Sequence, residues 1–124
     1  MRLTFIETSG FTQAVRAYFP DDAAYAAFQE ALLQNSARGD VMPGCGGLRK
    51  VRWPDPRRGK GKRGGLRLIY LHVPEAETVV LLDVYDKDET DDLTQDQRRQ
   101  LAQLAHAIRE ELLRPQRSGG RRPT

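Results

Sequence analysis

The chain has little cysteine, because Cys45 is the only one among its 124 residues. A single cysteine cannot form an intramolecular disulfide, and it leaves no set of thiolates for a zinc site. No apolar run approaches the ~18 residues that a membrane-spanning helix needs, and the first residues lack the features of a secretory signal. We therefore expect a cytoplasmic protein that needs no metal or other cofactor and does not contact a membrane.

Histidine is also scarce, with only His72 and His106 in the chain. None of the HExxH, Walker or GxSxG motifs occurs, and the GKGKRGG segment lacks the spacing of a phosphate-binding P-loop. The sequence therefore gives no indication of a zinc protease, an NTPase or a serine hydrolase.

The pattern of apolar residues predicts one small domain with the element order β-α-α-β-β-β-α. Strands are expected at Leu3–Glu7, Leu48–Trp53, Leu66–Val73 and Thr78–Tyr85. Three consecutive strands with short links favour an antiparallel meander, which the first strand joins at one edge or beside the last strand. We expect an α+β fold with helices packed on the sheet, in which residues 1–114 form the domain and residues 115–124 a disordered basic tail.

The ends of the helices are indicated by polar residues that can cap them. Ser9 is expected to cap the first helix, and Asp21 or Asp22 the second. Thr94 and Gln97 have the spacing of a capping box at the start of the last helix.

Positive charge is concentrated in one segment of the chain. Between Arg49 and Arg67 there are nine basic residues and one acid, a formal charge of +8, whereas the whole chain carries +3. Such a segment is typical of a surface that binds a polyanion, nucleic acid above all. A solvated charged loop is the alternative interpretation.

The predicted strands would bring several of these cations together. Lys50 and Arg52 share one face of their strand, because side chains alternate along it. The following strands contribute Arg67, Tyr70, Tyr85 and, directly after the last strand, Lys87. Gathering like charges costs free energy unless an anion binds among them, and an arginine can hold a phosphate through two hydrogen bonds.

Three segments of the chain carry a resemblance to a known family: GCGGLRKVRW, GKGKRGGLRLIY and VVLLDVYDKDETDDLT. In order and spacing they resemble the RelE/HigB-type toxins of bacterial toxin–antitoxin modules, especially the HigB branch with GTGGLRK, GKGKRGG and VYxK segments. The resemblance covers about residues 5–113. It implies a RelE-like α+β domain and an endoribonuclease that cleaves mRNA, usually in the ribosomal A site. It also implies a cognate antitoxin as partner, often one with a helix-turn-helix domain.

Five residues are candidates for catalysis. Arg67 matches the arginine that family members place against the scissile phosphate, and Lys87 matches the basic residue after the last strand. Lys50 and Arg52 match basic positions on the first strand of the meander. Tyr85 is a candidate for stacking on a base or assisting proton transfer. In the implied reaction the 2′-OH of the RNA attacks the adjacent phosphate, which leaves a 2′,3′-cyclic phosphate and a 5′-OH.

Five further residues are candidates for RNA binding: Arg49, Lys60, Lys62, Arg63 and Tyr70. The three loop cations match the basic loop of the family, which implies contacts with the RNA backbone. The chain also departs from the family pattern. The segment after the last strand, DETDDL, lacks the tyrosine of some RelE-type toxins, and Asp86 stands where a glycine is expected, so the general acid is not assigned.

Two other functions remain open at this point. One is a toxin that inhibits DNA gyrase on the same fold, and the other is a non-catalytic RNA-binding module. A gyrase inhibitor does not require Arg67 and Lys87 to face one phosphate-sized pocket.

Overall fold

The computed structural model describes residues 2–57, 65–86 and 93–115. The strands are β1 (Thr4–Glu7), β2 (Asp40–Val41), β3 (Arg49–Trp53), β4 (Leu66–Val73) and β5 (Thr78–Asp86). The helices are α1 (Ser9–Tyr18), α2 (Asp22–Gln34) and α3 (Gln95–Leu113), with a short 3-10 turn, η1 (Pro74–Ala76), between β4 and β5. The expected α+β class is confirmed.

The strands form one mixed sheet in the order β1-β5-β4-β3-β2. The antiparallel meander of β3, β4 and β5 is as predicted, and β1 pairs in parallel with β5 at the edge of the sheet. The two-residue strand β2, which pairs with β3, is not predicted by the sequence pattern. It is too short to show the alternation of apolar and polar residues from which a strand is recognised.

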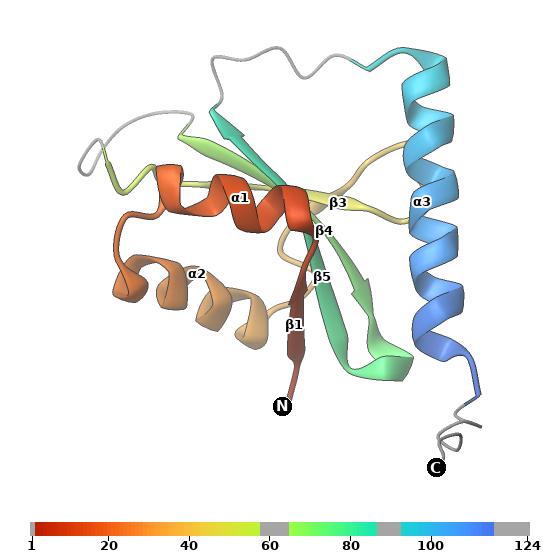
Figure 1. Cartoon of the computed structure of the whole chain (residues 1–124), viewed down its shortest axis with the longest axis horizontal. Coiled ribbons are helices and arrows are strands. Elements are labelled where there is room, and N and C mark those ends of the chain that lie inside the picture. The colour runs from red at the N-terminus through yellow and green to blue at the C-terminus, as the bar shows by residue number, and fades with distance from the viewer. Residues whose placement is uncertain (1, 58–64, 87–92, 116–124) are drawn as a thin grey trace.

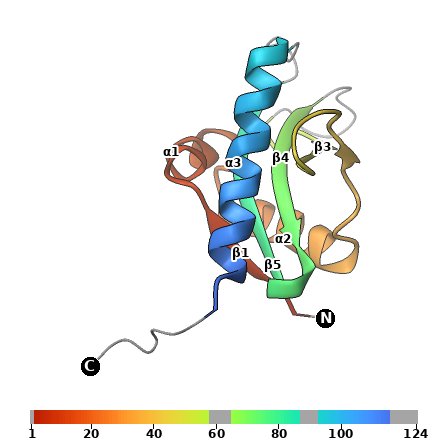
Figure 2. The ribbon, with the colours of Figure 1, turned by 90° about the vertical axis from the view of Figure 1, so that its right-hand side faces the viewer.

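Helices cover both faces of the sheet (Figure 1). The helices α1 and α2 lie on one face, where Phe11, Phe19 and Phe28 pack with Leu68 and Leu81 of the strands. The helix α3 crosses the other face, as the rotated view in Figure 2 shows. There Ala105 packs in a second cluster with strand residues of β4 and β5 and with the turn before β3. The strand β5 is therefore covered on both faces, as its continuous apolar sequence predicts.

The helix caps follow local polar residues, with one difference from expectation. Thr8 rather than Ser9 caps α1, since its hydroxyl accepts a hydrogen bond of 3.2 Å from the Phe11 amide. Asp21 caps α2, and Thr94 with Gln97 forms the expected capping box of α3. None of the helices in the described ranges is long and apolar enough to cross a membrane.

The position of α3 is fixed by the glycine-rich turn before β3. Gly46 has φ +71°, and a Cβ built on it would lie 3.0 Å from the Ala102 Cα of α3, so only glycine allows this close approach. Arg98 donates a hydrogen bond of 2.8 Å to the Pro43 carbonyl, and Arg109 one of 3.0 Å to the Gly46 carbonyl. These contacts hold α3 across the sheet face that carries the candidate site.

Candidate anion-binding site

A groove of about 720 Å³ lies between the β2–β3–β4 side of the sheet and the start of α3. Its charged lining residues are Arg38, Asp40, Lys50, Arg52, Arg67 and Arg98. We refer to the groove lined by these six residues as the cationic groove. Among the residues that the structure describes, five cations and one acid give the lining a formal charge of +4. The cations come from four places in the chain: the segment after α2, β3, β4 and α3.

The strand register explains why three of these cations lie together. Arg52 is the direct partner of Arg67, and Arg67 is in turn the direct partner of Tyr85. Direct cross-strand partners share a face, with Cβ atoms about 5 Å apart. This is the face that carries α3, because Ile69 of β4, two residues after Arg67, packs in the α3 cluster. Lys50, the partner of Ile69, lies on the same face.

The other two cations are held by neutral groups. The Arg38 guanidinium lies 5.2 Å from the centre of the Trp53 ring, a cation–π contact. Arg98 is positioned by the Pro43 carbonyl. Neither of these contacts is to a carboxylate, so neither contact neutralises the charge of the guanidinium.

Two of the residues predicted to bind RNA lie away from the groove. Arg49 alternates with Lys50, and its Nη1 donates hydrogen bonds to the carbonyls of Gly39 and Ala37 at 2.7 and 3.4 Å. Tyr70 is completely buried between the sheet and the α1–α2 layer. Arg49 therefore ties the segment after α2 to β3 through these hydrogen bonds.

The hydroxyl of Tyr70 is held on both sides. It donates a hydrogen bond of 2.7 Å to the Ser36 carbonyl and accepts one of 2.9 Å from the Gly39 amide. Burial raises the pKa of Tyr70 above its ordinary value. A ring with no exposed surface cannot stack on an RNA base, so Tyr70 is a core residue. The sequence pattern did not distinguish it from Tyr85, because both are aromatic residues on strands.

Arg57 is a further member of the basic segment that the fold uses for its own contacts. Its backbone amide and guanidinium donate three hydrogen bonds of 2.7–3.0 Å to the buried carboxylate of Asp55. The same guanidinium lies 3.3 Å from the Asp86 carboxylate and stacks on the Tyr18 ring at 4.7 Å. Asp86, the residue that departs from the family pattern, is thus paired with Arg57 at the end of β5. An aspartate after a proline is a local signal for such a turn, because its carboxylate can accept from the backbone amide two residues further on.

Several predicted residues lie outside the described ranges: Lys60, Lys62, Arg63, Lys87 and the tail 116–124. Their roles stay predictions. The sequence analysis also missed two residues of the cationic groove, Arg38 and Arg98, which lie outside the basic segment between Arg49 and Arg67. No local pattern reveals them, because only the packing of α3 and the path after α2 bring them to the groove.

No protein-family model matches the chain. The function is therefore argued from the cationic groove, together with the segments that carry the resemblance.

Proposed function

We propose that the protein is an mRNA endoribonuclease of the RelE/HigB toxin type, with the RelE-like topology of that family. In this proposal it cleaves messages bound to the ribosome and is neutralised by a cognate antitoxin. The observation that carries the proposal is the convergence of five cations from four chain segments on the cationic groove, against one acid among the described residues. Such a charge distribution favours a polyanion, and the phosphodiester backbone of RNA is one.

Arg67 is the residue that we place against the scissile phosphate. It lies between Arg52 and Tyr85 in the strand register, at the centre of the row of side chains that crosses the sheet. Its guanidinium can donate two parallel hydrogen bonds to the non-bridging oxygens. These bonds strengthen as negative charge develops in the transition state, which lowers the barrier.

The reaction requires two proton transfers. The 2′-oxygen forms a bond to phosphorus and loses its proton to a general base, while the bond from phosphorus to the 5′-oxygen breaks and that oxygen gains a proton. Among the described residues, Lys50 and Tyr85 are the candidates for these transfers. Holding the RNA so that the 2′-oxygen is in line with the leaving oxygen contributes the remainder of the rate enhancement.

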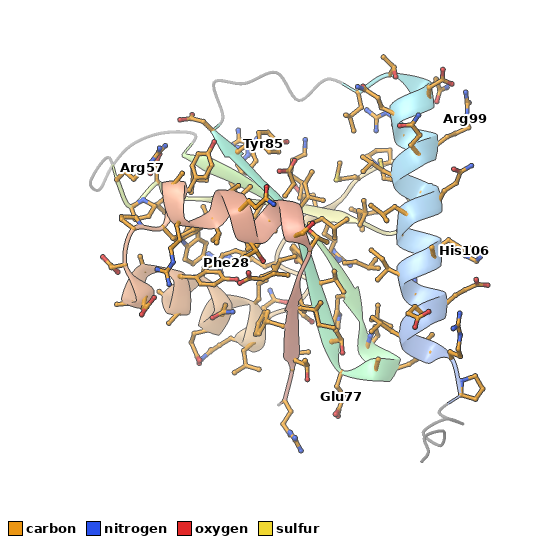
Figure 3. The ribbon with its side chains drawn as sticks, viewed as in Figure 1. Phe28, Arg57, Glu77, Tyr85, Arg99 and His106 are labelled. Atoms are coloured by element: carbon orange, nitrogen blue, oxygen red, sulfur yellow. The ribbon has the colours of Figure 1, made fainter. Side chains whose placement is uncertain are left out.

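The test is cleavage of a defined message on ribosomes, with the new ends mapped and their chemistry determined. The parent protein is expected to leave 2′,3′-cyclic phosphate and 5′-OH ends. Arg67→Ala should lower the rate by ~10²-fold, or about 3 kcal/mol of transition-state stabilisation. The matched control is Arg99→Ala, because Arg99 is an exposed arginine of α3 that pairs with Asp96 and points away from the sheet (Figure 3).

Other outcomes would favour other functions. A folded Arg67→Ala protein that cleaves at the parent rate would remove Arg67 from the active site. Growth arrest with gyrase inhibition and no new mRNA ends would identify a gyrase inhibitor. RNA binding without cleavage by the parent protein would identify a non-catalytic module.

A further inference from the structure

The row of side chains assigned to the phosphate lies close to one end of the sheet. Arg52, Arg67 and Tyr85 are direct cross-strand partners in β3, β4 and β5. One residue further along is the last row of pairs in the part of the chain that the structure describes: Trp53, Leu66 and Asp86. Strand ends open more readily than strand centres, because fewer contacts hold them. The position of Arg67 therefore depends on what holds this last row in place.

The strand ends in the last row are held in different ways. The Trp53 ring packs edge-on against Phe28 of α2, with 5.2 Å between the ring centres, and Leu66 is completely buried in the α1–α2 core. The Asp86 carboxylate is instead paired with the Arg57 guanidinium at 3.3 Å. The end of β5 is thus tied to the rest of the fold through an ion pair.

Arg57 can serve as an anchor because other parts of the chain hold it. Its backbone amide and guanidinium donate three hydrogen bonds to the buried carboxylate of Asp55, which follows β3. The guanidinium also lies over the Tyr18 ring and donates a hydrogen bond of 3.5 Å to the Ala17 carbonyl, both in α1. A planar guanidinium can bind two carboxylates at once. Arg57 therefore joins α1, the turn after β3 and the end of β5.

The pair between Arg57 and Asp86 is also better shielded from water than a typical surface pair. Their side chains are 34% and 16% exposed, against 61% and 88% for Arg16 and Asp22, which pair between α1 and α2. Shielding strengthens an ion pair, whereas exposed pairs contribute little. The contact can therefore hold a strand end.

We propose that Arg57 is a positioning residue of the phosphate site, which fixes Tyr85 and Arg67 by holding Asp86 and does not contact the RNA. The proposal rests on the proposed function, in which Arg67 binds the scissile phosphate. Asp86 directly follows Tyr85, and Tyr85 is the direct partner of Arg67. Figure 3 shows Arg57 and Tyr85 at the same end of the sheet. A shift of ~1 Å in a reacting group can lower a rate by ~10²-fold, so the strand end must be held firmly.

The test begins with Asp86→Asn, which removes the charge that pairs with Arg57 and keeps the size of the side chain. Single-turnover cleavage of a ribosome-bound message at saturating protein should slow by at least about tenfold. Affinity for inorganic phosphate should not fall, because loss of a carboxylate leaves the surroundings of the groove more positive. The matched control is Asp22→Asn, which removes a carboxylate from the exposed pair with Arg16 and should keep the parent rate.

A double-mutant cycle assigns the effect to Arg57 rather than to another neighbour of Asp86. Arg57→Lys keeps the positive charge, but a single ammonium lacks the planar fork that binds Asp55 and Asp86 together. This variant should slow cleavage as Asp86→Asn does, and the combined variant should be no slower than the slower single one. Losses that multiply in the combined variant would overturn the proposal, because Asp86 would then act independently of Arg57.

Backbone amide exchange tests the anchor without any cleavage. The amides of residues 84–86 should exchange faster in Asp86→Asn than in the parent protein. Faster exchange in a protein whose parent cleaves no message would reject the endoribonuclease and support the anchor. If the parent does cleave, a folded Asp86→Asn protein with the parent rate, or with unchanged exchange, rejects the positioning role of Arg57 alone.

Discussion

Arg52 of β3 stands directly opposite Arg67 of β4, so two arginine side chains start from neighbouring positions on one face of the sheet. Like charges in direct cross-strand positions destabilise a sheet, and favourable cross-strand pairs contribute about 0.2–1 kcal/mol, which sets the scale of the effect. An anion bound between them removes the repulsion and adds hydrogen bonds to both. We therefore expect an anion bound between the two arginines to raise the free energy of unfolding.

The first prediction concerns this pair in the absence and presence of an anion. In low salt, Arg52→Ala and Arg67→Ala should each leave the fold intact, and a double-mutant cycle should give an unfavourable coupling of about 0.2–1 kcal/mol. Adding phosphate should raise the melting temperature of the parent more than that of either variant. Arg99→Ala should respond to phosphate as the parent does. A favourable coupling in low salt would show that the two arginines are held together by another group.

The second prediction separates the core tyrosine from the groove. Tyr70→Phe removes the hydroxyl that accepts from the Gly39 amide and donates to the Ser36 carbonyl, so it leaves both backbone groups without this partner. The free energy of unfolding should fall by about 1–3 kcal/mol, as measured by urea denaturation. RNA affinity at a temperature where the variant is folded should equal that of the parent. Reduced affinity with unchanged stability would place Tyr70 at the RNA interface after all.

The sequence predicts more of the fold than of the candidate site. The alternation of Leu66–Val73 and the capping pair Thr94 and Gln97 are local signals, and both elements form where these signals indicate. Alternation also placed Lys50 and Arg52 on one face. Arg98 could not be assigned in this way, because its position depends on how the turn at Gly46 packs against α3. Burial is a property of the whole fold, and Tyr70 and Tyr85 are therefore alike in sequence but not in structure.

The third prediction concerns alkaline pH. The Tyr25 hydroxyl donates a hydrogen bond of 2.6 Å to the Glu7 carboxylate, and burial, followed by this bond, raises the pKa of Tyr25 well above its ordinary value. The pKa of Tyr70 is also raised by burial. In the unfolded chain both hydroxyls ionise near pH 10, so the unfolded state loses protons first as the pH rises.

The stabilisation from both tyrosines is therefore complete below about pH 10 and is lost as the pH rises above that value. The slope should approach about 1.4 kcal/mol per pH unit for each group. Urea denaturation at several pH values between about pH 8 and pH 11 measures this dependence of the free energy of unfolding on pH. Tyr25→Phe should show a shallower decline than the parent above pH 10. Equal slopes for the two proteins would contradict the assignment to Tyr25.

The last prediction compares two glycines that differ in what surrounds them. Gly65, directly before β4, has φ +47°, and a Cβ there would overlap the Trp53 carbonyl oxygen and lie 3.1 Å from the Asp55 amide. Gly10 lies in α1 with no atom within 4 Å of the position that a Cβ would take. Gly65→Ala should lower the free energy of unfolding by at least about 2 kcal/mol, through left-handed backbone strain and displacement of the end of β3.

Gly10→Ala should instead raise the free energy of unfolding by about 0.5–1 kcal/mol, because alanine loses less backbone entropy than glycine on entering a helix. Thermal and urea denaturation of the two variants measure both effects under the same conditions. Since Gly65 precedes Arg67 by two residues, Gly65→Ala should also weaken phosphate binding, whereas Gly10→Ala should leave it unchanged. Equal effects of the two substitutions would mean that the chain before β4 can move aside, and that the position of Arg67 does not depend on the close contact between Gly65 and Trp53.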